Sequence, residues 1–371
     1  GNAIVLVKNM EPFSFVTLTK AKKTNKNSRK ALNTNQVSTK YYNISWNENG
    51  HLISIYDKEA NREIIPEGKF GNVFQVFEDK PRCFDAWELE PTIDLKQDIV
   101  KECKDIQVED NDLGIFVSFT WEYHKSVIKQ TMCLYHDKKR IDFKTEVDWQ
   151  ERQTLMKVAF PVNIRAVDAR FDIQYGNIRR PITRNNSWEV AKFEVVAHKW
   201  IDLSETGYGI SLLNDCKYGH DVKEDTIRLT LLKSAVYPDY TADLGHHEFT
   251  YALLPHTAEW YQSNIEKEAF DLNNPIVAVP GVSKITKDSI FTFNNEYIVV
   301  DCIKQAENAK ETVIRFHEYA GSRGEVIINS RIPVKSWCEC DLMEQPLEDF
   351  KNEPIAIKIK PYEIKTILVK F

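Results

Sequence analysis

The sequence lacks the features that mark membrane, secreted and nucleic-acid-binding proteins. No stretch approaches the roughly 20 consecutive apolar residues that span a bilayer, and no charged-then-apolar leader opens the chain. Lysine and arginine together number 49 against 55 acidic residues, so the formal charge is -6. Nucleic-acid binding relies on a surplus of positive charge that neutralises phosphates. We therefore expect no membrane span and no nucleic-acid partner.

Cysteine is also scarce, with seven residues scattered along a chain of 371. They do not suggest a disulfide framework, and Cys338-Glu339-Cys340 is too closely spaced for a zinc knuckle. This usage favours a reducing compartment, and we expect a cytoplasmic protein. The chain opens on Gly1 and runs at once into the apolar stretch Ile4–Val7, which suggests a fragment of a longer protein.

The common catalytic motifs are missing too. The sequence contains no Gly-x-Gly-x-x-Gly after a strand, no phosphate-binding Gly-Lys-Ser/Thr loop, no Gly-x-Ser-x-Gly elbow and no His-Glu-x-x-His helix. Nucleotide and cofactor chemistry are therefore disfavoured, and we expect no cofactor and no metal site within this chain.

What is present is alternation of apolar and polar residues at period 2, the pattern of half-buried strands. It is clearest from Arg140 to Asp148, and Asn49-Gly50 supplies a tight turn between two apolar runs at 41–46 and 51–56. Further short strands are expected at 114–120, 127–134, 157–164, 209–213, 226–232, 297–302, 312–317, 325–328, 355–359 and 364–369. Many short strands joined by polar turns predict an all-β sandwich.

Two shifts in composition divide the chain, whose length favours more than one domain. Lys20 to Gln36 is rich in Lys, Asn, Thr and Ser, which predicts a mobile loop after an opening strand. A second shift lies near Asn273-Asn274-Pro275. We therefore predict an opening strand and loop over 1–36, a large β domain over 37–272 and a small β domain over 273–371.

Three segments concentrate residues capable of chemistry: 77–87, 176–220 and 238–256. In the first, carboxylates stand beside aromatics, which suits a sugar with hydroxyls at its edge and an apolar face. An ordinary salt bridge and a core tryptophan explain it equally well. In the second, Arg and Asn side chains supply forked donors, although buried Arg, His and Trp commonly tie loops to a sheet. In the third, His246 and His247 point to opposite faces of a strand and do not easily share a metal.

These segments, in this order, resemble the C-terminal β region of glycoside hydrolase family 38 α-mannosidases of the bacterial and cytosolic type. The resemblance covers nearly the whole chain. It rests on 77–81 with 85–87, on 180–185, on 193–195 with 198–200, on 214–220, on 251–256, and on the hairpin with 55–59.

The resemblance implies a mutarotase-like antiparallel β-supersandwich followed by a small C-terminal β-sandwich domain. In the family, an Asp nucleophile, a second carboxylic acid and a zinc ion lie on an N-terminal α/β barrel. A retaining mechanism needs two carboxyl groups about 5–5.5 Å apart, and no segment here matches the family's nucleophile or metal motifs. The resemblance therefore implies a C-terminal part that is inactive alone, with the barrel as its partner, zinc or another divalent metal in that barrel, and an α-mannoside as substrate.

The resemblance also implies a supporting role at the rim of the sugar pocket, centred on residues 239–247. Golgi and lysosomal members place an arginine near this loop, whereas Tyr240-Thr241-Ala242 stands here, and Asp243 and His246 are our substitutes. The predicted rim or barrel-docking residues are Asp85, Trp87, Arg180, Arg184, Asn185, Asn214, Asp215, His220, Asp239, Asp243 and His246.

Two other functions fit the residues. One is a free-standing carbohydrate-binding module, since β-sandwiches host both binding and enzymatic functions. The other is a mutarotase-type or lyase-type catalytic domain that uses His198, His220 or His246 with a carboxylate as acid and base. A fragment separated from its barrel would expose an apolar face of several hundred Å2, so we also expect a homo-oligomer.

Overall fold

The computed structural model of the chain describes residues 7, 10, 14–18, 30–281 and 287–371. These described residues divide into a large unit, which lies within 25–173 and 178–275, and a small unit, which lies within 1–24, 174–177 and 276–371. The predicted strand at 4–7 falls almost entirely outside the described residues. No helix of the described residues is long and apolar enough to cross a membrane.

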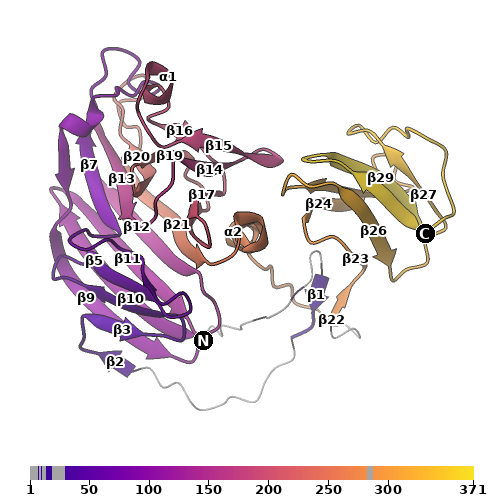
Figure 1. The fold of residues 1–371 in the computed structure, drawn as a ribbon, viewed down its shortest axis with the longest axis horizontal. Helices are drawn as coiled ribbons and strands as arrows, with labels where there is room; N and C mark the ends of the chain where they lie inside the picture. The colour runs from indigo at the N-terminus through magenta and orange to yellow at the C-terminus, as the bar shows by residue number, and fades with distance from the viewer. Residues whose placement is uncertain (1–6, 8–9, 11–13, 19–29, 282–286) are drawn as a thin grey trace. The chain divides into compact units, whose positions relative to one another are not determined.

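The large unit is built on two antiparallel sheets that share one apolar core (Figure 1). The ten-stranded sheet has the order β15 (Gly176–Pro181), β14 (Asp168–Ile173), β17 (Trp200–Glu205), β18 (Tyr208–Asn214), β21 (Gly245–His256), β12 (Ile141–Trp149), β11 (Ser126–Tyr135), β10 (Gly114–Tyr123), β9 (Glu102–Asn111), β2 (Lys30–Leu32). The six-stranded sheet has the order β16 (Val195–Val196), β19 (Gly219–Lys223), β20 (Thr226–Lys233), β13 (Thr154–Pro161), β7 (Val73–Glu78), β8 (Gln97–Ile99).

A third sheet covers one part of this core. It has four strands in the order β3 (Gln36–Ser38), β4 (Tyr42–Trp46), β5 (Leu52–Asp57), β6 (Arg62–Glu63). The predicted turn joins β4 to β5: the Gly50 N–H donates to the Asn47 carbonyl at 3.0 Å, and Gly50 has a φ of 74°. A Cβ on Gly50 would stand 2.8 Å from the Trp121 ring, so both the turn and the close packing require glycine here.

The core of the large unit contains a neutral polar network, which we call the amide network. The Asn72 amide donates to Gln130 Oε1 at 2.7 Å, and the Gln130 amide donates to the hydroxyls of Thr145 and Tyr251 at 2.8 and 2.7 Å. The Tyr251 hydroxyl in turn donates to Asn72 Oδ1 at 2.6 Å. All four side chains are buried, and they join β11, β12 and β21 to the start of β7.

The large unit contains little helix. Its helical segments are η1 (Ile93–Leu95), α1 (Ser187–Val190), η2 (Trp260–Gln262) and α2 (Ile265–Asn273). α2 lies against β17 and β18, where the Trp200 indole N–H donates to Glu266 at 2.8 Å and Arg140 binds Glu268 at 3.0 Å. No helical periodicity in the sequence predicted α2.

The small unit is a two-sheet sandwich. Its sheets are β23 (Phe291–Phe293), β26 (Gly324–Ser330), β28 (Ile355–Ile359), and β24 (Ile298–Gln305), β25 (Thr312–Glu318), β29 (Ile364–Lys370), β27 (Ser336–Cys340), with β1 (Ser14–Val16) paired to β22 (Lys287–Ser289). Phe316, Val326, Trp337, Ile357 and Ile367 are buried in one cluster between the two sheets.

The all-β fold class is confirmed, and each predicted strand from residue 41 onward overlaps an observed one. One difference concerns the predicted loop over 20–36. Residues 19–29 lie outside the described residues, but Lys30–Leu32 forms β2, paired with β9, and Gln36 starts β3. Leu32 packs against the core of the large unit, whereas Ala31 is exposed.

Candidate functional site

At one end of the large unit, two segments of the chain cross between the two main sheets. β12 leads to β13 through residues 150–153, and β20 leads to β21 through residues 234–244. The Trp149 indole N–H donates to the Ser234 hydroxyl at 2.8 Å, so the two crossings are joined. We call this region, together with the loop 79–96 that follows β7, the crossover end.

Lys233 ties the loop after β7 to the loop before β21. Its ammonium binds the Asp79 carboxylate and donates to the Glu88 carbonyl at 3.0 Å, while its backbone N–H donates to Asp243 at 2.8 Å. Asp85 adds a second tie by accepting from the Val236 N–H at 2.8 Å. Burial raises the pKa of Asp79, an effect that the Lys233 ammonium opposes. The two loops therefore form one surface.

The loop over 234–244 is further held by its own polar groups. Asp239 accepts from the Thr241 N–H at 2.8 Å, which lowers the pKa of Asp239. The Asp243 carbonyl contacts His247 Nε2 at 2.9 Å. His246 projects to solvent and contacts Glu248 Oε1 at 3.0 Å. Asp239 and Asp243 therefore shape the loop, whereas His246 is available at its surface.

Exposed aromatic rings stand on both loops. Trp87 is 67% exposed and packs edge-to-face against Phe84, and Tyr240 is 64% exposed. An arginine does reach this loop from elsewhere in the chain: Arg152 lies over the Tyr240 ring, 3.8 Å from its centroid, and donates to the Tyr240 carbonyl. Exposed rings beside carboxylates offer both apolar and polar contacts to a partner surface or a sugar.

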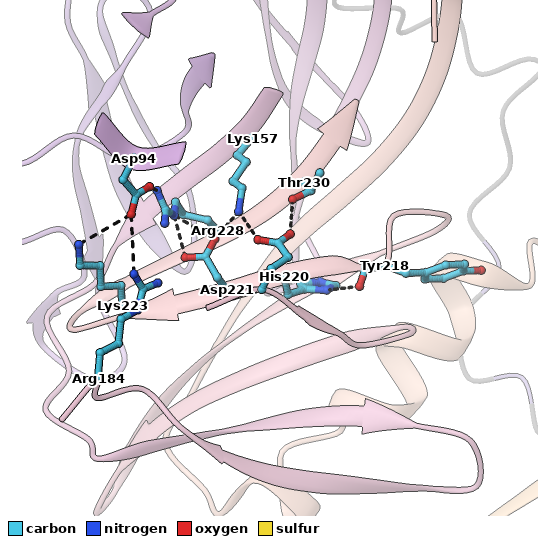
Figure 2. A network of polar contacts seen from close by, with 10 residues as sticks. Asp94, Lys157, Arg184, Tyr218, His220, Asp221, Lys223, Arg228 and Thr230 are labelled. Carbon is cyan, nitrogen blue, oxygen red and sulfur yellow. Dashed lines mark hydrogen bonds and ion pairs between the residues drawn. The ribbon is translucent and has the colours of Figure 1, made fainter. Parts of the chain in front are cut away.

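A buried ion cluster lies on the face of the six-stranded sheet that points away from the apolar core (Figure 2). Lys157 of β13 binds Glu194 and Asp221, the latter at 2.6 Å. Arg228 of β20 binds Asp221 at 2.8 Å and Asp94 of η1 at 2.9 Å. Arg184 and Lys223 approach Asp94 at 3.8 Å each. We call Lys157, Glu194, Asp221, Arg228 and Asp94 the ion cluster.

The ion cluster fastens two loops to the sheet. Asp94 belongs to the loop after β7, and Glu194 belongs to the loop between α1 and β16. Burial raises the pKa of Asp94, but the Arg228 hydrogen bond and charge outweigh it, so that the net pKa is lowered. Burial lowers the pKa of Lys157, and its two carboxylate partners outweigh that effect. The partners of Asp94 and Lys157 therefore favour the charged form of each.

His220 stands beside the ion cluster on β19 but faces the opposite side of the sheet. Its Nδ1 contacts the Tyr218 carbonyl at 3.1 Å, and its Nε2 has no hydrogen-bond partner among the described residues. Burial lowers the pKa of His220 to about 4. A histidine in this position has no carboxylate with which to act as an acid-base pair. His198 likewise has no carboxylate contact at its ring among those described; its ring lies near that of Tyr218.

The remaining predicted site residues do not gather at the crossover end. They contact local groups instead. Arg180 lies over the Phe171 ring and donates to the Val196 carbonyl, and the Asn185 backbone N–H donates to Glu189. The Asn214 side chain donates to the His198 carbonyl and accepts from the Lys217 N–H, and Asp215 accepts from the Thr250 N–H. Asp85, Trp87, Asp239, Asp243 and His246 are brought to one end, and Arg184 joins the periphery of the ion cluster.

Two family models match the chain. One, described as the glycosyl hydrolases family 38 C-terminal domain, covers residues 37–241, and the other, described as the family 38 C-terminal beta sandwich domain, covers residues 297–367. The chain belongs to glycosyl hydrolase family 38.

Relatives of this family 38 chain carry α-mannosidase names. It is 37% identical to alpha-mannosidase G of Dictyostelium discoideum over 89% of this chain and 32% of that protein. It is 34% identical to human alpha-mannosidase 2C1 over 86% of this chain and 32% of that protein. An alpha-mannosidase structure from Enterococcus faecalis V583 has the same fold, with a TM-score of 0.73 at 15% identity, over 91% of this chain and 43% of that one. The family 38 chain spans about a third of the length of the curated relatives it matches.

The described residues of the family 38 chain do not suit a zinc ion. No group of three or more His, Cys, Asp or Glu side chains among them is arranged to hold a metal. His246 and His247 contact Glu248 and the Asp243 carbonyl respectively, which separates the two rings as their alternation on the strand predicts.

Sequence reasoning missed the residues that organise the family 38 chain around its loops. Lys233, Arg152, Lys157, Asp221 and Arg228 were not singled out. The available signal was weak: Lys157 precedes the apolar run Val158–Phe160, and its partners Glu194 and Asp221 follow 37 and 64 residues later. Only folding brings them together.

Proposed function

We propose that this chain is the C-terminal, non-catalytic part of an α-mannosidase. In the intact protein, the catalytic domain removes terminal α-linked mannose with retention, and the crossover end of this chain packs on that domain and completes its sugar pocket. The observation that carries the proposal is that Lys233 and Asp85 hold the loops 79–88 and 234–247 together. Trp87, Tyr240 and His246 are exposed on the surface that these two loops form.

The proposal assigns different roles to the predicted rim residues. Asp85 and Asp243 hold backbone N–H groups and fix the shape of the loops. Trp87 and Tyr240 offer rings for contact with the catalytic domain or with an apolar sugar face. His246, with Glu248 beside it, offers a polar contact at the rim. None of these groups forms a nucleophile and acid pair.

The metal and the cellular location belong to the same proposal. Because the described residues do not suit zinc, we propose that zinc or another divalent metal is held by the catalytic domain, and no step here depends on it. All seven cysteines are free thiols, which supports a reducing cytoplasmic location. Self-association stays a prediction.

Hydrolysis of a chromogenic α-mannoside by this chain and by the full-length protein, each with and without added zinc or cobalt, tests the proposal. We expect activity only in the full-length protein. Activity of the 371-residue chain alone would contradict the division of labour. Sugar binding by this chain with no hydrolysis by the full-length protein would instead support a free-standing carbohydrate-binding module.

A further inference from the structure

The face of the ten-stranded sheet that points away from the apolar core carries the segment 257–273, which contains η2 and α2. On β17, Ile201 belongs to the core, so its neighbours Trp200 and Asp202 point to the opposite, outer face. Trp200 stacks there on Trp260 of η2, with ring centroids 5.6 Å apart. The segment is therefore held on the sheet by side chains of the outer face.

A buried histidine joins the sheet to the first residues of this segment. His256 is the last residue of β21, and its side chain is 5% exposed. Its Nε2 contacts Asp202 Oδ1 at 2.8 Å, and its Nδ1 contacts the Ala258 carbonyl at 2.8 Å. The Asp202 carboxylate also accepts from the hydroxyls of Ser204 and Ser211, the latter at 2.7 Å. One ring therefore connects β17 to the chain that leads into η2.

The two contacts of the His256 ring require both of its nitrogens to carry a proton. A carbonyl oxygen and a carboxylate accept hydrogen bonds, whereas a neutral imidazole has a single N–H to donate. The imidazolium donates to both oxygens. Loss of its proton turns a nitrogen lone pair toward either Asp202 or the Ala258 carbonyl, so one of the two bonds is lost.

The ring is also closely packed. Gly209 of β18 lies opposite His256 in the sheet, and a Cβ on Gly209 would stand 2.3 Å from both His256 Cε1 and Ser204 Oγ. Only glycine permits this approach. Because the ring is buried and closely packed, a bond lost on deprotonation is left unmade, which costs more than the same loss at a surface.

The groups next to the ring favour its protonated form. Burial lowers the pKa of His256, but the Asp202 hydrogen bond and charge, the Ala258 carbonyl and the Glu259 charge outweigh it, so the net pKa is raised above 6.5. A group whose pKa is raised by folding stabilises the fold fully below its unfolded pKa and loses this contribution as the pH rises through its folded pKa. The contact is therefore weakened on the alkaline side.

Other charged side chains lie on the same face. Arg170 of β14 stands opposite Asp202 in the sheet, and its guanidinium lies over the Trp260 ring, 4.4 Å from the centroid. Around α2, Arg140 pairs with Asp142 and Glu268, and Lys199 pairs with Glu266. These pairs fasten α2 itself, whereas His256 fastens the chain that precedes it.

We propose that His256 is a pH-sensitive latch that holds the segment 257–273 on the sheet when protonated and lets it open more often as the pH rises above neutrality. The protonated ring ties Ala258 to Asp202, and the neutral ring keeps one of these bonds. α2 ends at Asn273 and the small unit resumes at residue 276, so the latch acts on the last helix before the chain enters the small unit.

Hydrogen exchange of the full-length protein, followed by mass spectrometry at pH 6.0, 7.5 and 9.0, tests the latch. Each rate is divided by the intrinsic rate at the same pH, which removes the catalysis by hydroxide. Protection of residues 260–273 should fall about tenfold across this range, the effect of losing one hydrogen bond to a charged group. Protection of β13, in the other sheet, should stay constant.

Three variants identify the group that titrates. In His256→Gln, protection of 260–273 should be lower than in the wild type at pH 6.0 and independent of pH. In Glu259→Gln, which removes an exposed charge, the fall should move to lower pH. The matched control is His247→Gln, on the same strand, whose ring contacts the Asp243 carbonyl; it should behave as the wild type.

Constant protection of 260–273 from pH 6.0 to pH 9.0 in the wild type would overturn the latch, and so would an equal fall in His256→Gln. If His256→Gln does not fold, Glu259→Gln still decides, because a fall at the wild-type pH shows that another group titrates. An equal fall in β13 would mean that the large unit opens as a whole, which also contradicts a local latch. Exchange needs no substrate, so the result does not depend on the proposed function.

Discussion

The ion cluster and the amide network are both buried polar networks in the large unit, yet they connect different things. The amide network joins strands of the two main sheets inside the core, and its members are neutral. The ion cluster joins two loops to the outer face of one sheet, and its members are charged. Neutral groups cost less to desolvate, so they suit the core, whereas charges fix loops only where every ion has a partner.

The largest expected effect comes from removing the central cation of the ion cluster. Lys157→Met leaves Asp221 with Arg228 alone and leaves Glu194 without its lysine, so we expect the free energy of unfolding to fall by about 3–5 kcal/mol. Urea unfolding followed by tryptophan fluorescence measures this change. A loss below that of Tyr251→Phe would show that the ion cluster is the weaker of the two networks.

A pH titration tests the core-facing side of the six-stranded sheet, where His220 lies, separately from the ion cluster on the other side. His220 is neutral when folded, with a pKa lowered to about 4 by burial, whereas the unfolded value is about 6.5. The unfolded chain therefore binds more protons between these values, and stability falls as the pH drops through that window, by up to about 3 kcal/mol near pH 4.

The urea midpoint of the wild type and of His220→Gln, measured from pH 7 to pH 4.5, checks this sign. The wild type should lose stability more steeply than the variant. His256 has a raised pKa, because Asp202 outweighs its burial, and contributes in the opposite direction in both proteins, so only their difference is informative. Parallel curves would show that His220 does not stay neutral in the folded state.

A smaller effect is expected from the amide network. Tyr251→Phe removes a hydroxyl that donates to Asn72 and accepts from Gln130, so two amide groups lose a partner. We expect a loss of about 1–3 kcal/mol in the free energy of unfolding. The loss should be the same at pH 5 and pH 8, since no group in this network titrates there; a strong pH dependence would tie the network to a charge.

The smallest effect is expected at the edge of the ion cluster. Asp94→Asn removes one charge-assisted bond to Arg228 in a partly exposed position, and the change in global stability should not exceed about 1 kcal/mol. Hydrogen exchange should nevertheless quicken in residues 88–96 while β13 is unaffected. Equal acceleration in both would mean that η1 and the sheet open together.

The all-β fold could be predicted because alternation is a local signal. Arg140 to Asp148 alternates, and β12 forms there with Lys144, Glu146 and Asp148 exposed and the apolar side chains buried. Asp142 departs from the pattern, because it is buried in an ion pair with Arg140. α2 could not be predicted in this way, because only Ile265, Glu266 and Ala269 are buried and its anchors Trp200 and Arg140 come from distant strands. A helix held by such contacts has little periodicity of its own.

The candidate site was partly predictable for the same reason. Carboxylates beside aromatics in 77–87 and 238–248 pointed to the two loops that Lys233 and Asp85 join. His220, Asn214 and Asp215 showed the same residue types, but the structure uses them to satisfy backbone groups or buries them. Residue type cannot distinguish a side chain that holds its own loop from one that meets a ligand.

The pairing of β12 with β21 has a consequence for the nascent chain. β12 ends at Trp149 and its partner β21 starts at Gly245. During synthesis, one edge of β12 therefore stays unpaired until almost a hundred further residues have been made. An unpaired strand edge invites association with other chains. Lys144, Glu146 and Asp148 are exposed along that strand, and their charges protect the growing protein while its sheet is incomplete.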